Sequence, residues 1–161
     1  MAKARAIPGF ADATSFKNAA GRAVAVRTEE VFAHSDGVLD TADIERVHDM
    51  RVATRRLRAA MEIFAACFPK KEHHQLLREV KTLADVLGER RDPDVLVAAL
   101  DKLADGLTAN ERPGIRHLVA ELRAQQAEAN ERLAAELRRV ASEGLCDRLL
   151  ALAASATGKA A

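Results

Sequence analysis

Apolar residues recur every three or four positions through most of this sequence, and this spacing constrains the fold more than any other feature. At about 100° per residue, such positions share one face of an α-helix. Strand-forming residues are scarce, since aromatic residues make up 3% of the chain, with no Trp and no Tyr. Helix-favouring Ala, Leu, Glu and Arg are abundant. The sequence therefore predicts an all-α fold, an antiparallel bundle of about five to six helices.

Turn and capping signals divide the chain into six expected helices. Ser35-Asp36-Gly37 indicates a turn, Pro69 and Gly88 indicate helix ends, and Asp92-Pro93 is typical of a helix start. The first expected helix covers residues 16–34. The second starts at a cap formed by Asp40 or Thr41 and ends at residue 68. The other four cover residues 70–88, 93–107, 111–141 and 145–152. Residues 1–15 are expected to form a flexible N-terminal arm, residues 16–154 the helical domain and residues 155–161 a frayed tail.

Length, charge and cysteine usage limit the class of protein. A chain of 161 residues is long enough for one domain with a substantial core. Its 25 basic and 24 acidic residues give a formal net charge of +1, which argues against a surface that is basic throughout. We expect no signal peptide and no membrane span, since no apolar run reaches the roughly 20 residues that span a bilayer, and Cys67 and Cys146 lack metal-ligand spacing. We expect a soluble, cytoplasmic protein.

Residues 44–68, IERVHDMRVATRRLRAAMEIFAACF, combine an apolar and a basic strip. The apolar strip, expected to face the core, consists of Val47, Met50, Thr54, Leu57, Met61, Phe64 and Phe68. His48, Arg51, Arg55 and Arg58 share a second strip about 80° wide and roughly 15 Å long, and Arg56 points elsewhere. Like charges at these spacings repel one another. Because arginine suits bidentate binding of phosphate oxygens, the strip indicates a surface for an anion.

Residues 70–88 repeat this pattern. The apolar set consists of Leu76, Leu77, Val80, Leu83, Ala84 and Leu87, and the basic strip of Lys71, His74, Arg78 and Lys81. Because a short turn at Pro69 joins the two segments, we expect the helices to lie side by side, with their basic strips bordering one shallow groove. The alternative interpretation of such a strip is an ordinary solvated helix face.

Two segments resemble a known family. Residues 47–58, VHDMRVATRRLR, and residues 87–95, LGERRDPDV, are similar to those of the CHAD family, the conserved histidine α-helical domain. The resemblance covers residues 16–150. It implies a helical domain that binds inorganic polyphosphate and associates with polyphosphate granules. The candidate polyphosphate-binding residues are His48, Arg51, Arg55, Arg56, Arg58, His74, Arg78, Lys81 and Arg91, and we expect no catalytic residue, cofactor or metal ligand.

Members of this family commonly contain two similar helical halves, each with a basic surface around a central groove. This chain has one basic segment of this kind, and the helix expected over residues 111–141 does not repeat it. We therefore predict a homodimer, in which two-fold symmetry turns both basic surfaces towards one channel.

Three other functions remain as alternatives. Nucleic acid is the alternative polyanion, but single-strand binders stack bases on aromatic side chains, and Phe32, Phe64 and Phe68 are expected in the core. A metal-dependent or phosphate-processing enzyme is the alternative from another class. Glu45 and His48 form one Glu-x-x-His motif, whereas a di-iron bundle needs two and further glutamates, and no phosphate loop or nucleophile motif is present. A scaffold that pairs only with other helices is the third. We expect no enzymatic activity and no nucleic-acid binding.

Overall fold

The fold is described from a computed structural model over residues 3–13 and 15–157. Across these ranges the chain forms five α-helices, one short 3-10 helix and no strand, which confirms the predicted all-α fold. The elements are α1 (Phe16–Ala33), α2 (Ile44–Ile63), η1 (Ala65–Cys67), α3 (Lys70–Asp105), α4 (Arg112–Ser142) and α5 (Leu145–Thr157). None of the helices within the described ranges is long and apolar enough to cross a membrane.

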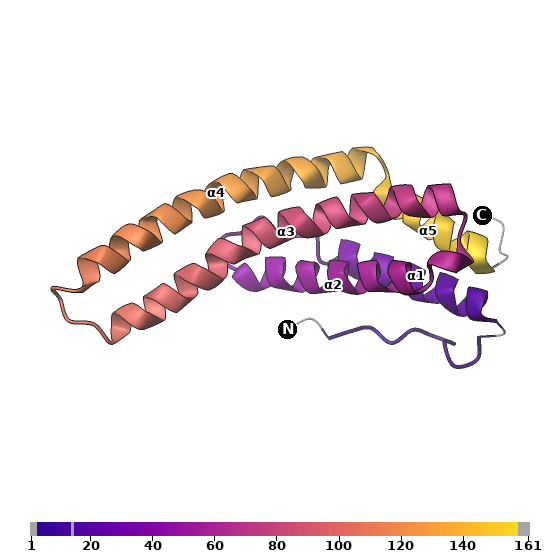
Figure 1. Ribbon diagram of the computed structural model, residues 1–161, viewed down its shortest axis with the longest axis horizontal. Coiled ribbons are helices and arrows are strands. Elements are labelled where there is room, and N and C mark those ends of the chain that lie inside the picture. The colour runs from indigo at the N-terminus through magenta and orange to yellow at the C-terminus, as the bar shows by residue number, and fades with distance from the viewer. Residues whose placement is uncertain (1–2, 14, 158–161) are drawn as a thin grey trace.

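The longest helices, α3 and α4, form an antiparallel hairpin that runs along most of the length of the molecule (Figure 1). The other helices gather at the end of the hairpin where α3 starts and α4 finishes. There α2 packs against α3, and α1 packs against both α2 and α5. The opposite end, made of the last turns of α3 and the first turns of α4, projects beyond α2 (Figure 1). The core of the bundle therefore lies towards one end of the hairpin.

The apolar strip predicted for α2 and the segment after it forms the centre of this core. All seven of its residues, from Val47 to Phe68, are at most 8% exposed. In α3 the predicted Leu76, Val80, Leu83 and Leu87 are buried as well. Because these apolar residues are buried, they fix the rotation of α2 and α3 about their axes. The basic strips of both helices therefore face away from the core.

α3 is one continuous helix of 36 residues, so the predicted break between residues 88 and 93 is wrong. Gly88 is helical and Pro93 lies inside the helix. A proline in a helix interior costs about 3 kcal/mol, because it removes one backbone hydrogen bond and its ring crowds the preceding turn. Pro93 is buried, and contacts of α3 with α4 offset this cost. Local helix-ending signals were overridden by tertiary packing.

Two helix boundaries also differ from the prediction. The cap of α2 is Asp43, whose side chain accepts a hydrogen bond from the Glu45 amide at 3.3 Å, whereas Asp40 and Thr41 lie in the preceding loop. α5 continues to Thr157, so residues 155–157 of the expected frayed tail are helical. Residues 158–161 of that tail lie outside the described residues.

Residues 3–13, the larger part of the expected N-terminal arm, contact α1. The Arg5 amide donates a hydrogen bond to Glu30 Oε1 at 2.8 Å, and Glu30 also pairs with Arg27 and Arg56. Burial alone would raise the pKa of Glu30, but hydrogen bonds from Arg27 and the Arg5 amide, with the charges of Arg27 and Arg56, bring it below its ordinary value. Glu30 thus connects the N-terminal segment, α1 and α2. Residues 1, 2 and 14 of the arm lie outside the described part.

Candidate anion-binding site

The basic strips of α2 and α3 meet along the seam between the two helices. Arg58 Nε and Lys81 Nζ lie 3.1 and 3.2 Å from the same carboxylate oxygen of Glu62. Elsewhere along the seam, a Cβ added at Gly88 would lie 3.9 Å from Arg51 Nε. Arg51 is thus opposite Gly88 and Arg58 opposite Lys81, as expected for antiparallel helices. We call His48, Arg51, Arg55 and Arg58 of α2, with His74, Arg78 and Lys81 of α3, the basic surface.

Several members of the basic surface have no acidic partner. The side chains of Arg51, Arg55 and Arg78 make no hydrogen bond or ion pair with any residue that the structure describes, whereas a ring nitrogen of His48 lies within 4.8 Å of the Glu45 and Asp49 carboxylates. Arg55 and Arg78 are exposed, and His48 and Arg51 are half-buried. The three arginines therefore create a local excess of positive charge on a chain whose formal net charge is only +1. Such a surface is suited to several adjacent anionic oxygens.

Glu62 is a member of this site that the sequence analysis did not identify. Hydrogen bonds from Arg58 and Lys81 hold the pKa of the Glu62 carboxyl below its ordinary value, so it is ionised at neutral pH. Its position four residues after Arg58 is the spacing of a helical ion pair, which was the available signal. The contact with Lys81 depends on the packing of α3 and has no signal in the local sequence.

Arg56 and Arg91, which are also predicted as binding residues, lie outside the basic surface as defined above and interact with other parts of the fold. Arg56 Nη1 points towards α1, where it lies 3.5 Å from Oε1 of the buried Glu30. Arg91 donates a hydrogen bond to the Ile44 carbonyl at 3.2 Å and lies 3.5 Å from Glu45 Oε1. Both guanidinium groups therefore connect helices within the fold.

The two adjacent histidines of α3 have different surroundings. His73 is buried, and its Nε2 lies 2.9 Å from the Met61 carbonyl oxygen, which ties the start of α3 to the end of α2. His74 is exposed, and its ring centre lies 5.8 Å from that of His73. Because His74 precedes Arg78 by about one helical turn, it lies at the end of the basic surface.

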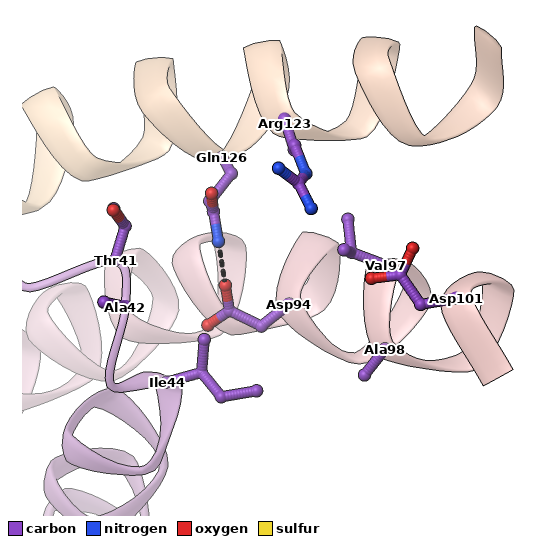
Figure 2. A pocket seen from close by; sticks show the side chains of 9 residues that line it. All are labelled: Thr41, Ala42, Ile44, Asp94, Val97, Ala98, Asp101, Arg123 and Gln126. Atoms are coloured by element: carbon purple, nitrogen blue, oxygen red, sulfur yellow. Dashed lines mark hydrogen bonds between the residues drawn. The ribbon is translucent and has the colours of Figure 1, made fainter. Parts of the chain in front are cut away.

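Arg90 and Asp94 form a buried ion pair within the continuous helix α3, where the sequence predicted a break between residues 88 and 93. Both side chains are 0% exposed. Arg90 Nε donates to Asn130 Oδ1 at 3.0 Å, and Gln126 Nε2 donates to Asp94 Oδ1 at 2.5 Å (Figure 2). The pair thus fastens α3 to α4 on either side of Pro93. Opposite charges four residues apart indicate an ion pair when both residues lie on one helix. This signal was not used, because the sequence predicted a helix break between the two residues.

A pocket of about 390 Å³ lies beside this ion pair, between α3, α4 and the loop that precedes α2 (Figure 2). Its lining consists of Thr41, Ala42, Ile44, Asp94, Val97, Ala98, Asp101, Arg123 and Gln126. None of these is a residue of the basic surface. With two carboxylates against one guanidinium, the pocket is not suited to a polyanion.

Glu45, His48 and Asp49 form a cluster near the start of α2. Their potential metal-ligand atoms lie within 4.8 Å of one another, and no other such group of three is found in the part of the chain that the structure describes. The cluster contains the Glu-x-x-His motif, but a di-iron bundle requires a second one, which the sequence lacks. Arg91 pairs with Glu45 and would compete with a metal ion for this carboxylate.

These features define an all-α domain with an exposed basic surface on one antiparallel helix pair. The family model of the CHAD domain matches residues 22–161, so the chain belongs to the CHAD domain family. This confirms the resemblance seen in the sequence. The family is generally linked to polyphosphate- and triphosphate-related proteins.

Two curated relatives come from Mycobacterium tuberculosis. "Uncharacterized protein Rv2226" of strain ATCC 25618 / H37Rv is 31% identical over 122 residues, and "Uncharacterized protein MT2285" of strain CDC 1551 / Oshkosh is 30% identical over 122 residues. Each alignment covers 65% of this chain and 24% of the relative, so the chain spans about a quarter of the length of these proteins. No solved structure matches the chain.

Proposed function

We propose that this chain binds inorganic polyphosphate on the basic surface of α2 and α3 and associates with polyphosphate granules. The observation that supports this most strongly is that Arg51, Arg55 and Arg78 share one surface without an acidic partner among the described residues. Polyphosphate offers closely spaced anionic oxygens and no bases, so suitably spaced cations are sufficient to hold it. The link of the CHAD domain family with polyphosphate- and triphosphate-related proteins supports the same ligand.

Binding is expected to weaken steeply with salt, because a polyanion releases its counterions when the protein neutralises its phosphates. With about four phosphate contacts, raising the salt from 50 to 200 mM should lower the affinity about 50-fold. Titration of the protein with polyphosphate of defined lengths at both salt concentrations measures this change. Binding that does not respond to salt, or no binding at the lower concentration, would contradict the proposal.

Single-stranded DNA is the comparison that separates this ligand from nucleic acid. Non-specific single-strand binders stack bases on aromatic side chains, and none of the five Phe residues belongs to the basic surface. We therefore expect polyphosphate to displace DNA at equal phosphate concentration in a competition titration. Preferential retention of DNA would favour the nucleic-acid alternative.

We further propose that binding is not accompanied by catalysis. The polar cluster of Glu45, His48 and Asp49 is the observation that favours the alternative, a metal-dependent enzyme. Metal analysis of the purified protein tests for a bound metal ion, and a phosphate-release assay with polyphosphate tests for catalysis. A stoichiometric metal ion with release of phosphate would support the enzyme.

We also propose that two chains pair through the projecting end of the α3–α4 hairpin. Four apolar side chains in this part of α3 and α4 are 46–52% exposed, namely Val95, Leu96, Leu103 and Leu118. A patch of exposed apolar residues is typical of a protein interface. A pair with two-fold symmetry would cover this patch on both chains and bring a second basic surface into the same particle.

Light scattering is expected to give the mass of two chains, each of 17.4 kDa, at working concentration. Introducing charge into the patch with Leu96→Glu and Leu103→Glu should reduce the mass to that of one chain. The matched control is Ile63→Glu, at a residue that is 69% exposed on α2, outside the hairpin, and should leave the mass unchanged. A mass of one chain for the unaltered protein would refute the pairing.

A further inference from the structure

Glu62 places an anion between two cations of the basic surface. Its Oε1 lies 3.1 Å from Arg58 Nε and 3.2 Å from Lys81 Nζ, and these cations come from different helices. Since one oxygen atom contacts both nitrogens, the nitrogens are close enough to share a single anionic group. A phosphate oxygen would accept the same two charge-assisted hydrogen bonds.

We propose that Arg58 and Lys81 form a phosphate subsite and that Glu62 occupies it as an internal competitor, which a bound polyanion displaces. This inference rests on the proposed polyphosphate binding. The basic surface has so far been described only by residues that raise its affinity for polyphosphate. Glu62 is a member that lowers this affinity. A ligand would therefore need enough negative charge to displace Glu62 before it could contact Arg58 and Lys81 as well as the rest of the basic surface.

The surroundings of Glu62 allow such a displacement without a change of fold. The side chains of Glu62 and Arg58 are both 43% exposed, and that of Lys81 is 40% exposed. Exposed ion pairs contribute little to stability, so their loss is readily offset by contacts with a ligand. Rotation about the side-chain bonds of Glu62 is sufficient to move its carboxylate into solvent, because α2 itself need not shift.

A polyphosphate chain has an electrostatic advantage over Glu62 in the competition for Arg58 and Lys81, because it carries many anionic groups. Hydrogen bonds from Arg58 and Lys81 lower the pKa of Glu62 below its ordinary value, so at neutral pH it competes with the ligand as a single carboxylate anion. A polyphosphate chain held by Arg51 and Arg55 carries further phosphates along the same seam. Those phosphates reach Arg58 at a high effective concentration, as in any multivalent ligand.

The substitution Glu62→Gln keeps the size of the side chain and removes its charge. We expect this variant to bind polyphosphate about 2- to 10-fold more tightly than the unaltered protein at low salt, since two exposed ion pairs no longer oppose the ligand. The salt dependence should also become steeper, because Arg58 and Lys81 no longer carry an internal counterion. The matched control is Glu128→Gln, at an exposed residue of α4 that changes the net charge by the same amount. It should bind like the unaltered protein.

A double-mutant cycle locates the effect at the subsite. If Glu62 competes through Lys81, the gain from Glu62→Gln should shrink when Lys81→Gln is also present. Equal affinities for Glu62→Gln and Glu128→Gln, or weaker binding by Glu62→Gln than by the unaltered protein, would exclude the internal competitor while leaving polyphosphate binding intact. Absence of binding by the unaltered protein in the same titration would instead remove the proposed function, and the subsite with it.

Discussion

Replacing Arg51 and Arg55 together by alanine is expected to weaken polyphosphate binding about 100-fold or more. Each arginine that binds a phosphate makes at least one hydrogen bond to a charged group, which contributes about 1.5–3 kcal/mol. Neither side chain has an ion-pair partner among the described residues, so their removal leaves no buried charge behind. The measurement is a polyphosphate titration at low salt, with the helical circular-dichroism signal recorded to show that the fold is retained.

The matched control for this pair is the double substitution Arg116→Ala and Arg138→Ala, at residues that likewise have no ion-pair partner among the described residues. Both residues are exposed on α4, and their loss lowers the net charge by the same two units. We expect this control to change the affinity only slightly, because long-range effects of exposed charges are screened within about 10 Å at 0.1 M salt. Equal losses in the two double variants would indicate a response to net charge, and the basic surface would then have no specific role.

Replacing Arg90 by alanine is expected to lower the free energy of unfolding by about 3–5 kcal/mol. Both Arg90 and Asp94 are 0% exposed, so the substitution leaves the Asp94 carboxylate buried, with Arg91 Nη1 at 4.0 Å from its Oδ2 as the remaining cation. It also removes the hydrogen bond to Asn130 that joins α3 to α4. Chemical denaturation followed by circular dichroism measures the loss. A decrease below about 1 kcal/mol, the median for an ordinary substitution, would contradict the role of this pair.

Two further variants separate the buried charge from other effects of the substitution. Arg138→Ala makes the same chemical change at an exposed position of α4 and should alter stability by less than about 0.5 kcal/mol. Replacing both members of the pair, with Arg90→Met and Asp94→Leu, should recover part of the loss, because apolar side chains of similar size leave no unpaired charge. If the double variant were as unstable as Arg90→Ala, the lost hydrogen bonds with Asn130 and Gln126 rather than the orphaned carboxylate would be responsible.

The family motif therefore contains arginines with two different physical roles. Arg51 and Arg55 face the seam without acidic partners, whereas Arg90 is buried and Arg91 is bound to the start of α2. Substitutions of the first kind should change binding and leave stability nearly unaltered. Substitutions of the second kind should change stability first. Measuring both quantities for each variant distinguishes the two roles.

The sequence predicted the helical elements and their faces well where a long periodic pattern was present. The apolar strip from Val47 to Phe68 is buried throughout, and Arg58 of α2 and Lys81 of α3 meet at Glu62 across the seam between the two helices. The prediction was wrong where it relied on single residues, as at Gly88 and Pro93. A local helix-ending preference is worth only a few kcal/mol at most, and the contacts between α3 and α4 outweigh it.

What the sequence by itself determined is which side chains share a helical face, because the pitch of an α-helix is a local property of the backbone. That was sufficient for the all-α fold, the core positions of α2 and the existence of its basic strip. Only the tertiary structure decided which charges are neutralised, since the partners of Arg56, Lys81 and Arg90 lie on other helices or are buried by them. Contacts between residues far apart in the chain set the rotation and neighbours of each helix, and no local periodicity encodes them.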